Sequence, residues 1–491
     1  MSRQHLLRQL ALPDRYERLV SLLGPEVVQV LVPPEQNTVD GFERIALAVQ
    51  TRNEGLLVPA FGQSGIGKTT MLDNLTHFLP EHYSQTLNYQ GDISFDSLER
   101  EANAYTQGYP PSETRVLPIN VDHRENAPPT DRELADMKRF LRVTTCPVRP
   151  VIIWPDTSES NTRDIAARYT QVAGVSPVDL PLTIAGPQRE AWIDIARNTL
   201  RLANEVDSLE QLGVDPSNYD PADYQAIGAF LRQLSTDFDN IRFQLQKETR
   251  KQISLVVIFP SESETPGILS QLTNSTRYGL IDPSALLGVT AKSSLGRWWE
   301  PRRGLLTRAV VQLDAHCLFL PPGISVGFLR RHGPQPVQDA LGKAGIPNPT
   351  ADRLARDLAR ADFGKFLTGG EMKAYEARGK PAKKSVEAFQ TIAAQGFVQG
   401  KDKALNKGVA EALRTCLPKL SVNPSDIQVE KQLDFCRLIP DISLHYPDNV
   451  LCAEFHWRNG NFLSTSNRSA TAQYILKKLR DYCRQLGWTA D

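Results

Sequence analysis

The sequence of 491 residues predicts an α/β protein with a doubly wound N-terminal domain, a helical middle region and a C-terminal α/β domain. Three observations support this prediction. Apolar runs of strand length alternate with helical patterns through the first part of the chain, which is typical of a mainly parallel sheet. The alternation breaks at Pro321-Pro322-Gly323, and a mostly helical pattern follows. Strand-like runs return after Lys403, where a second α/β unit begins.

The individual elements follow from the same periodicities. Residues 6–32 have a helical pattern that ends at Pro33-Pro34, and a second short helix is expected at 41–49. We expect strands at 56–61, 116–121, 151–154, 180–184, 255–259 and 309–313, and helices at 71–79, 132–141, 191–202 and 470–486. The predicted segments are 1–34 (N-terminal helical), 35–325 (doubly wound), 326–402 (helical and basic) and 403–491 (C-terminal α/β).

Composition and the N-terminal residues indicate a globular protein of the cytoplasm. Hydrophobic residues make up 41% and charged residues 23%, which is ordinary for such a protein. No run of 18 apolar residues occurs, and charges interrupt the apolar residues near the N-terminus, so we expect neither a signal peptide nor a membrane partner. The six cysteines lack metal-ligand spacing, so we expect reduced, mostly buried thiols.

The net charge of zero conceals two segments of opposite sign. Residues 205–239 hold eight acidic residues and one basic residue, so this segment is not expected to approach nucleic acid. Residues 360–407 hold ten basic and five acidic residues. This basic segment fits either the phosphate backbone of a nucleic acid or the solvated surface of a helical linker.

The most specific motif is GQSGIGKTT, which matches a phosphate-binding loop. The glycines allow backbone N–H groups to surround phosphates, Lys68 places a positive charge on the β and γ oxygens, and the Thr69 hydroxyl can bind Mg²⁺. The alternative is a chance match in a loop rich in Gly, Ser and Thr. The motif predicts a site for ATP and Mg²⁺ made of Gly62, Gln63, Ser64, Gly65, Ile66, Gly67, Lys68, Thr69 and Thr70.

The flanks of the motif supply the required order of strand, loop and helix. An apolar run precedes the loop, and residues 71–79 follow with helical spacing. Pro59 lies inside the expected strand but lacks an N–H group for a neighbouring strand. We therefore expect a bulge or an unpaired stretch beside Pro59.

A phosphate-binding loop also needs an acid at the end of a neighbouring strand, to order the Mg²⁺ shell. Asp156, Asp122 and the pair Glu262 and Glu264 all follow apolar runs. We favour Asp156 as a catalytic and metal-binding acid, with 151–154 as the strand beside the loop strand. Residues 255–259 would then form the next strand, and Ser261 at its end would sense the γ-phosphate beside Glu262. The alternative is that Asp156 caps the following helix.

The segment GRWWEPRRG carries Arg297, Arg302 and Arg303 before the last apolar run of this region. Residues 35–325 resemble AAA+-like P-loop ATPases, specifically at GQSGIGKT, whereas the long segment 157–251 departs from that family. The resemblance implies ATP hydrolysis in a homo-oligomer, with Arg302 or Arg303 reaching the nucleotide of a neighbouring subunit. The alternative is that these arginines stack on the adjacent tryptophans or bind phosphate backbone.

The segment RLIPDISLHYPDNVLCAEFHWRNG carries two acids, Asp441 and Glu454, separated by 13 positions. A hairpin between them would bring both carboxylates together, where they could hold Mg²⁺. This segment resembles the core of a PD-(D/E)xK nuclease, which implies that Asp441 and Glu454 are catalytic metal ligands. Glu411 stands where that family often has a further acid.

The C-terminal segment departs from this family at the position after the acids. His456 stands where the family has a lysine and is a candidate catalytic residue, since a histidine can bind phosphate or relay a proton. A histidine is neutral for much of the physiological pH range, so Lys477 or Lys478 on the next helix is a second candidate for the missing charge. The chain also ends at Asp491, before the strand that usually completes the sheet. The alternative is an α/β interaction domain in which Asp441 and Glu454 are turn and edge residues.

Two functional hypotheses follow. The first is an ATP-regulated, Mg²⁺-dependent nuclease acting on DNA, as in bacterial antiviral defence, aided by a partner protein encoded nearby. The second is an assembling ATPase whose C-terminal domain is not catalytic and binds nucleic acid or recruits a partner protein. A nucleotide kinase is disfavoured because no small-acceptor site is evident.

Overall fold

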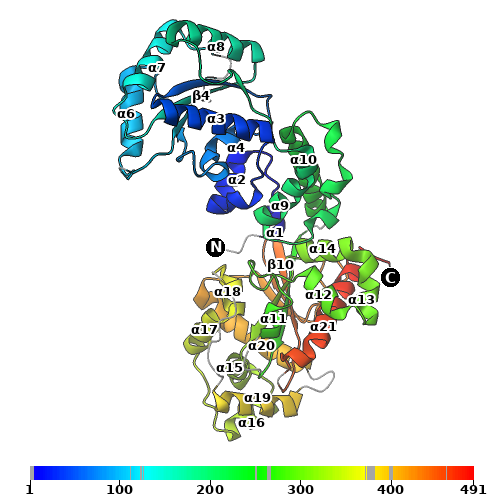
Figure 1. Cartoon of the computed structure of the whole chain (residues 1–491). Coiled ribbons are helices and arrows are strands. Elements are labelled where there is room, and N and C mark those ends of the chain that lie inside the picture. The colour runs from blue at the N-terminus through cyan, green and yellow to red at the C-terminus, as the bar shows by residue number, and fades with distance from the viewer. Residues whose placement is uncertain are drawn as a thin grey trace. The chain divides into compact units, whose positions relative to one another are not determined.

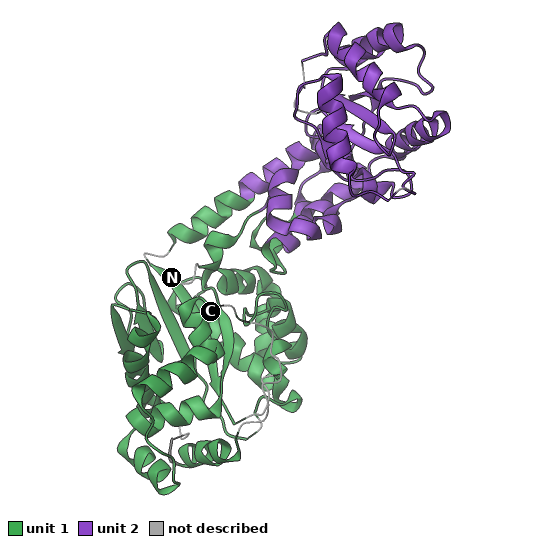
Figure 2. Ribbon diagram, turned by 90° about the vertical axis from the view of Figure 1, so that its left-hand side faces the viewer, with its two compact units in different colours: residues 1–11, 204–215, 238–491 green, residues 12–203, 216–237 purple. Residues whose placement is uncertain are grey.

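The computed structural model describes residues 5–110, 112–121, 124, 127–248, 251–262, 267–370, 372, 382–396, 402–460 and 462–490. The chain forms two compact units, which Figure 2 shows in different colours. Unit 2 comprises Leu12–Ala203 and Pro216–Asp237. Unit 1 comprises Met1–Ala11, Asn204–Asp215 and Phe238–Asp491. The predicted boundary between 325 and 326 therefore falls within unit 1.

Unit 2 is built on a five-stranded, all-parallel sheet in the order β2-β3-β4-β1-β5. Alternate residues of the strands enter two separate cores, because successive side chains of a strand point to opposite faces. Helices cover both faces (Figure 1), as expected for a doubly wound sheet. The strands are β1 (Leu56–Phe61), β2 (Leu87–Asn88), β3 (Leu117–Asn120), β4 (Pro150–Asp156) and β5 (Leu182–Thr183).

The helices of unit 2 divide between these two cores. Residues of α6, α7 and α8 pack on one face of the sheet, and residues of α3, α4 and α5 pack on the other. The α-helices are α2 (Tyr16–Leu23), α3 (Gln36–Arg52), α4 (Lys68–Asp73), α5 (Leu75–Phe78), α6 (Phe95–Thr106), α7 (Asp131–Val143), α8 (Glu159–Ala173) and α9 (Trp192–Asn204), with 3₁₀ turns η1 (Gly24–Val30), η3 (Arg189–Ala191), η5 (Pro216–Asn218) and η6 (Pro221–Asp223).

Unit 1 contains a mixed five-stranded sheet in the order β7-β6-β10-β9-β8. Strand β6 is parallel to β7 and β10, whereas β9 is antiparallel to β10 and β8. The strand that pairs with β10 on the side away from β9 is β6, which lies far upstream in the sequence. The strands are β6 (Gln252–Pro260), β7 (His316–Leu320), β8 (Asp426–Val429), β9 (Ile442–His445) and β10 (Asn449–Phe455).

The helices of unit 1 also cover two faces. Leu451, Ala453 and Phe455 of β10 enter a large core with residues of α15 to α20. Glu454 lies between them in the strand and contacts α21 on the opposite face. The elements are α1 (Leu6–Gln9), η4 (Leu209–Leu212), α11 (Gly267–Ser270), α12 (Pro283–Thr290), α13 (Ser294–Trp299), η7 (Glu300–Arg302), α14 (Arg303–Gln312), α15 (Pro322–His332), α16 (Gln335–Lys343), α17 (Ala351–Arg360), α18 (Asp362–Thr368), α19 (Lys383–Gly396), α20 (Asp402–Cys416), η8 (Leu417–Leu420), η9 (Thr465–Asn467) and α21 (Arg468–Gln485); α10 (Ile227–Lys247) contributes residues to both units.

Two predicted strand placements are wrong. Residues 255–259 do form a strand, but β6 belongs to the sheet of unit 1 and not to the sheet that contains β1. Residues 309–313 lie in and just after helix α14, and the strand comes later, at β7. Both segments are buried apolar runs. Such runs look alike in a buried helix and in strands of either sheet, so periodicity does not separate these possibilities.

Several other expectations are confirmed. All six cysteines are free thiols, and all except Cys436 are buried. The predicted helices at 41–49, 132–141, 191–202 and 470–486 correspond to α3, α7, α9 and α21. Residues 6–32 are helical only in pieces, namely α1, α2 and η1. No helix among the described residues is long and apolar enough to cross a membrane.

Candidate functional site

The glycine-rich loop of unit 2 joins the end of β1 to the start of α4, in the predicted order of strand, loop and helix. Gly65 and Gly67 have φ angles of 80° and 98°, a region that glycine adopts without a steric cost. The buried Nζ atom of Lys68 donates hydrogen bonds to the Gly62 carbonyl at 2.9 Å and the Gln63 carbonyl at 3.5 Å. The lysine side chain therefore folds back over the beginning of the loop.

The neighbour of the loop strand explains how Pro59 is accommodated. Strand β5 pairs with β1 only at Ala60 and Phe61. Pro59 precedes this short ladder, so its missing N–H group leaves no bond unmade with β5. The unpaired stretch that the sequence predicted beside Pro59 is confirmed.

Asp156 lies at the end of β4, directly beside the end of β1. Phe61 pairs with Asp156 in the parallel register, and the Gly62 N–H donates to the Asp156 carbonyl at 3.1 Å. The strand predicted to lie beside the loop strand is therefore confirmed. The carboxylate is fully buried and accepts hydrogen bonds from the Ser158 N–H at 2.7 Å and Asn161 Nδ2 at 3.3 Å. These bonds fit a role in shaping the turn before α8, and a role in Mg²⁺ binding stays a prediction.

The other acids proposed for this site lie elsewhere. Asp122 and Glu264 fall outside the described residues. Ser261 and Glu262 follow β6 and belong to unit 1, where Glu262 Oε1 accepts a hydrogen bond from the Gly460 N–H. Since β6 is not in the sheet of β1, the strand placement that assigned Ser261 and Glu262 to the nucleotide is wrong.

Two further glycines approach the loop and were missed by sequence reasoning. The Gly228 N–H donates to the Gly65 carbonyl at 2.8 Å. A Cβ atom on Gly228 would lie 2.9 Å from that carbonyl oxygen, and a Cβ atom on Gly186 would lie 2.4 Å from the Ile66 carbonyl oxygen. Larger residues at 186 or 228 would displace the loop. Isolated glycines far along the chain carry no sequence signal for this contact.

The second group of candidate residues lies in unit 1, on the β9–β10 hairpin. Ile442 pairs with Ala453, so Asp441 and Glu454 meet at the same end of the hairpin, as predicted. Asp441 Oδ2 accepts a hydrogen bond from the Phe455 N–H at 2.7 Å. Glu454 is only 2% exposed, although an ionised carboxylate is costly to bury without partners.

Helix α21 supplies those partners. Lys478 Nζ donates to Glu454 Oε2 at 2.5 Å, and the Tyr482 hydroxyl donates to Glu454 Oε1 at 2.6 Å. The sequence left Lys477 and Lys478 open as sources of positive charge, and the structure selects Lys478, since Lys477 is exposed. Tyr482 was not predicted, because a tyrosine within an amphipathic helix is usually a core residue.

The electrostatics of this group are strongly perturbed. Burial and, to a smaller extent, the neighbouring Glu454 raise the pKa of Asp441 to about 7, against the lowering effect of Lys478. Burial opposes the charge of Lys478, but Glu454, Tyr474 and Asp441 outweigh this effect and raise the lysine pKa above its ordinary value. The group therefore contains one cation and two carboxylates. Repulsion from Glu454 opposes the ionisation of Asp441.

His456 is placed beside this group but is electrically neutral. Its ring stacks on Tyr474 with centroids 3.6 Å apart, and Nε2 accepts a hydrogen bond from Arg458 Nε at 2.9 Å. Burial lowers the pKa of His456 to about 3, and Arg458 and Lys478 contribute in the same direction. It cannot supply the positive charge of the lysine that it replaces in the family pattern. Glu411, the further acid suggested by the sequence, is exposed and pairs with Arg414.

The chemistry of the donors is compatible with a divalent cation at this hairpin. Mg²⁺ is commonly bound by one or two carboxylates, with waters and substrate phosphates completing its shell. Asp441 and Glu454 provide two carboxylates, and their mutual repulsion would be relieved by a cation. The described residues contain no group of three or more His, Cys, Asp or Glu side chains suited to a metal ion. Any further ligands would have to be backbone, water or substrate oxygens.

The predicted arginines lie in unit 1 beside two tryptophans. The guanidinium of Arg302 lies 4.5 Å from the ring centroid of Trp298, and its Nη1 donates to the Trp298 carbonyl at 3.0 Å. Arg303 pairs with Glu300. The alternative of arginine stacking on tryptophan is thus confirmed for Arg302. A role for Arg302 or Arg303 at a neighbouring subunit's nucleotide stays a prediction.

The basic segment at 360–407 is described only in part. Lys373, Arg378, Lys380 and Lys401 lie outside the described residues. Within the described part, Lys383 pairs with Glu387 on the surface of α19, and Lys403 pairs with Glu430. These pairs fit the solvated helical surface as well as a phosphate-binding face.

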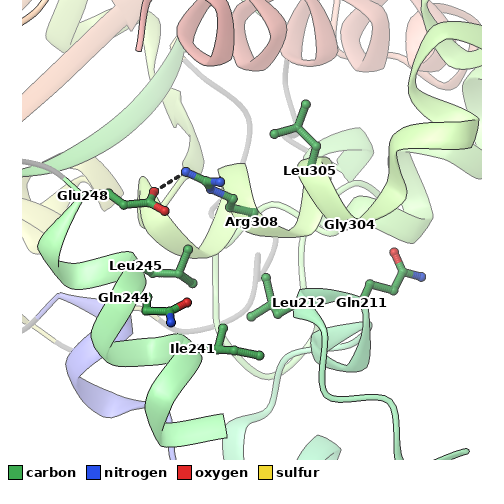
Figure 3. Close-up of a pocket in the computed structure, with 9 residues that line it drawn as sticks. All are labelled: Gln211, Leu212, Ile241, Gln244, Leu245, Glu248, Gly304, Leu305 and Arg308. Carbon is green, nitrogen blue, oxygen red and sulfur yellow. Dashed lines mark hydrogen bonds and ion pairs between the residues drawn. The ribbon is translucent and has the colours of Figure 1, made fainter. Parts of the chain in front are cut away.

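A pocket of about 370 Å³ lies in unit 1 (Figure 3). Arg308 and Glu248 pair with each other at its wall, next to the side chains of Leu245 and Leu305. The pocket contains neither the glycine-rich loop nor the hairpin acids. The charged side chains of Arg308 and Glu248 at the pocket wall already pair with each other, so we assign the pocket no ligand.

The fold and these residues define an α/β protein with one parallel and one mixed five-stranded sheet. No family model matches the sequence, and no curated protein matches it.

Proposed function

We propose that the chain is an ATP-regulated nuclease in which unit 2 binds ATP and unit 1 cleaves DNA. The observation that carries this proposal is the Glu454–Lys478 ion pair beside Asp441 on a buried hairpin. Such a combination of acids and a lysine is the one that the resemblance to PD-(D/E)xK nucleases leads us to expect. A cytoplasmic, homo-oligomeric effector of bacterial antiviral defence, with a partner protein encoded nearby, would suit this combination of activities.

The residues of unit 1 have complementary roles in this proposal. Asp441 and Glu454 would hold Mg²⁺, which when bound activates water and stabilises negative charge on a phosphodiester. Lys478 provides a positive charge in place of the family lysine, at the position where this chain has His456. Tyr482 fixes the orientation of Glu454 through its hydrogen bond to Oε1. His456 and Tyr474 stack on each other beside these residues.

The residues of unit 2 support ATP binding of the AAA+-like type. The loop from Gly62 to Thr70 has glycines at the positions with positive φ, and Lys68 and Thr69 follow at the start of α4. Lys68 would contact the β and γ phosphates, and Thr69 would bind Mg²⁺. Asp156 is the described acid on the strand beside the loop strand, and we propose it as the acid that orders this Mg²⁺ shell.

The test is incubation of the purified chain with supercoiled plasmid, with and without ATP, in Mg²⁺ or Mn²⁺. We expect nicking or linearisation that disappears in Asp441→Ala and Glu454→Ala and changes its ATP dependence in Lys68→Ala. Asp339→Ala is the matched control, because Asp339 is an exposed carboxylate of the same unit. Cleavage that persists in both hairpin variants would refute the assigned site.

A second function is favoured by a specific observation, namely that both oxygens of Glu454 already accept hydrogen bonds within the protein. In this alternative the chain is an assembling ATPase, and the C-terminal part recruits a partner protein or binds nucleic acid without cleaving it. No metal would then support cleavage, while Lys68→Ala would abolish ATP-dependent assembly in light scattering.

A further inference from the structure

We propose that helix α10 transmits the nucleotide state of the glycine-rich loop to the helices beside the hairpin acids. This inference rests on the proposed function, because it names the element through which ATP regulates the nuclease. Helix α10 has 21 residues, of which the first half belongs to unit 2 and the second half to unit 1. A helix of this length extends over about 30 Å. Each of its two ends is bonded to a different part of the proposed machinery.

The first turn of α10 is bonded to the glycine-rich loop within unit 2. The Gly228 N–H donates to the Gly65 carbonyl at 2.8 Å, and the two glycines are so close that a side chain at Gly228 would collide with this carbonyl. Phe230, one turn further along α10, is fully buried against the ring of Trp192. The beginning of the helix is therefore held tightly, and a movement of the loop at Gly65 would reach it directly.

The geometry of the peptide group explains why a bound phosphate would act on this contact. The Gly65 carbonyl and the Ile66 N–H belong to one planar trans peptide group, so they point in opposite directions. A phosphate-binding loop surrounds its phosphates with backbone N–H groups such as that of Ile66. A phosphate that accepts a hydrogen bond from the Ile66 N–H would therefore also fix the direction of the carbonyl that holds α10.

The far end of α10 is bonded to α14 within unit 1. The buried Gln312 of α14 donates from Nε2 to the Leu245 carbonyl at 2.9 Å, and Glu248, directly after α10, pairs with Arg308 of α14. Helix α14 packs in turn against α21, which carries Lys478 of the hairpin site (Figure 1). One intervening helix thus connects the end of α10 to the helix that contacts the acids.

The middle of α10 is held by the N-terminal segment, which also passes from one unit to the other. In unit 2, Ser235 Oγ donates to the Leu12 carbonyl at 2.7 Å. In unit 1, Arg242 Nη1 donates to the Leu10 carbonyl at 2.8 Å. Leu10 and Leu12 are themselves buried. Helix α10 is therefore bonded to the same segment on both sides of the point where its residues change from one unit to the other.

A continuous helix suits this role because its backbone bonds join each residue to the one four positions earlier, so order in one turn favours order in the next. Asp239 and Asn240 lie just after the change of units, and both are exposed. Asp239 pairs only along the helix, with Arg242. Glycine is the poorest helix former apart from proline, so glycines at 239 and 240 would soften α10 without removing its bonds to the loop or to α14.

The experiment measures amide hydrogen exchange by mass spectrometry in the full chain, with and without a saturating non-hydrolysable ATP analogue and Mg²⁺. The variant Asp239→Gly/Asn240→Gly softens α10, and Asp239→Ala/Asn240→Ala removes the same side chains but keeps a good helix former. The matched control Arg163→Gly/Asp164→Gly places two glycines at exposed positions of α8, where an ion pair along the helix is also lost. Circular dichroism melting verifies that each variant is folded, and Asn240→Gly alone is the milder variant.

In the wild type, we expect the nucleotide to slow exchange in the loop at 62–70 and in α14 by about fivefold or more, the lower end of typical coupling between sites. In the α10 glycine variant, the loop should still be protected by the nucleotide, whereas the response of α14 should disappear. The alanine variant and the α8 control should respond as the wild type does. A full α14 response in the glycine variant would overturn the inference, as would an equal loss of response in the alanine variant.

The result is distinguishable from failure of the proposed function. Absence of nucleotide protection in the wild-type loop would refute ATP binding by unit 2 and the inference together. Protection of the loop without any change in α14 would support ATP binding and overturn the inference alone. Plasmid cleavage that depends on Glu454 tests the nuclease separately, and the α10 glycine variant should retain this cleavage but lose its dependence on ATP.

Discussion

Lys478 and Glu454 are 24 residues apart in the sequence, yet the lysine Nζ lies 2.5 Å from the glutamate Oε2. The lysine reaches the carboxylate from α21, which packs on the face of the sheet toward which Glu454 points. The pair is the electrostatic centre of the hairpin site, because both charges act on the pKa of Asp441 and the Tyr482 hydroxyl also donates to Glu454.

Removing the lysine should destabilise the metal-free protein. Lys478→Met leaves the buried Glu454 without its cation, which costs about 3 kcal/mol of unfolding free energy. The double variant Lys478→Met/Glu454→Gln should recover most of this loss, because no unpaired charge remains. Urea unfolding in EDTA measures both. Lys477→Met is the matched control, since Lys477 is exposed, and an equal cost for Lys477→Met and Lys478→Met would contradict the prediction.

The neutral His456 predicts a specific dependence of stability on pH. Its folded-state pKa of about 3 is below the unfolded value, so the unfolded chain binds more protons between pH 3 and 6.5. His456 therefore costs the wild type stability as the pH falls through this range, by up to about 2 kcal/mol at pH 5. His456→Gln lacks this cost. Its stability relative to the wild type should improve between pH 7.5 and pH 5, measured by urea unfolding in EDTA.

Gly228 should be needed for the conformation of the glycine-rich loop. In Gly228→Ala, the new Cβ would lie 2.9 Å from the Gly65 carbonyl oxygen, which is backbone and must shift. We expect a loss of about 1–3 kcal/mol in unfolding free energy and weaker binding of a fluorescent ATP analogue. Gly108→Ala is the control, because nothing lies within 4 Å of a Cβ atom there. Wild-type nucleotide affinity in Gly228→Ala would show that the contact is irrelevant to the loop.

Lys68 should determine nucleotide affinity without determining the fold. Lys68→Ala removes the charge proposed for the β and γ phosphates, so we expect at least tenfold weaker binding of ATP in equilibrium titrations. Affinity for the monophosphate should change little, since it lacks those phosphates. Arg163→Ala, on the exposed face of α8, is the charge-matched control. A uniform loss for both nucleotides would point to a disturbed loop and not to a lost phosphate contact.

The sequence predicted local elements better than their assembly. The strand at 151–154 and its place beside β1 were predicted from its apolar run and from the requirement for an acid at the end of the strand beside the loop strand. The strand at 255–259 was assigned to the wrong sheet, because its partner β10 lies almost 200 residues later. Hydrophobic periodicity reports burial but contains no information about pairing over such a distance.

For the candidate sites as well, local contacts were predicted better than contacts between distant parts of the chain. Asp441 and Glu454 were predicted to meet because a single hairpin joins them. Lys478 remained one of two candidates, because only the rotation of α21 decides which of two adjacent lysines points toward the sheet. Gly228 and Tyr482 were missed, since their contacts depend on the packing of distant helices and leave no motif in the sequence.

The pairing of β6 with β10 has a consequence for biosynthesis. Translation delivers β6 and β7 long before β10, so the N–H and C=O groups along one side of β6 have no strand partner until residues 449–455 leave the ribosome. The sheet of unit 1 closes only then, and the hairpin acids reach their final positions in the same step. A nascent or prematurely terminated chain would therefore hold a complete glycine-rich loop but no assembled hairpin site. Any cleavage activity of this protein would begin only after β10 and α21 have been synthesised.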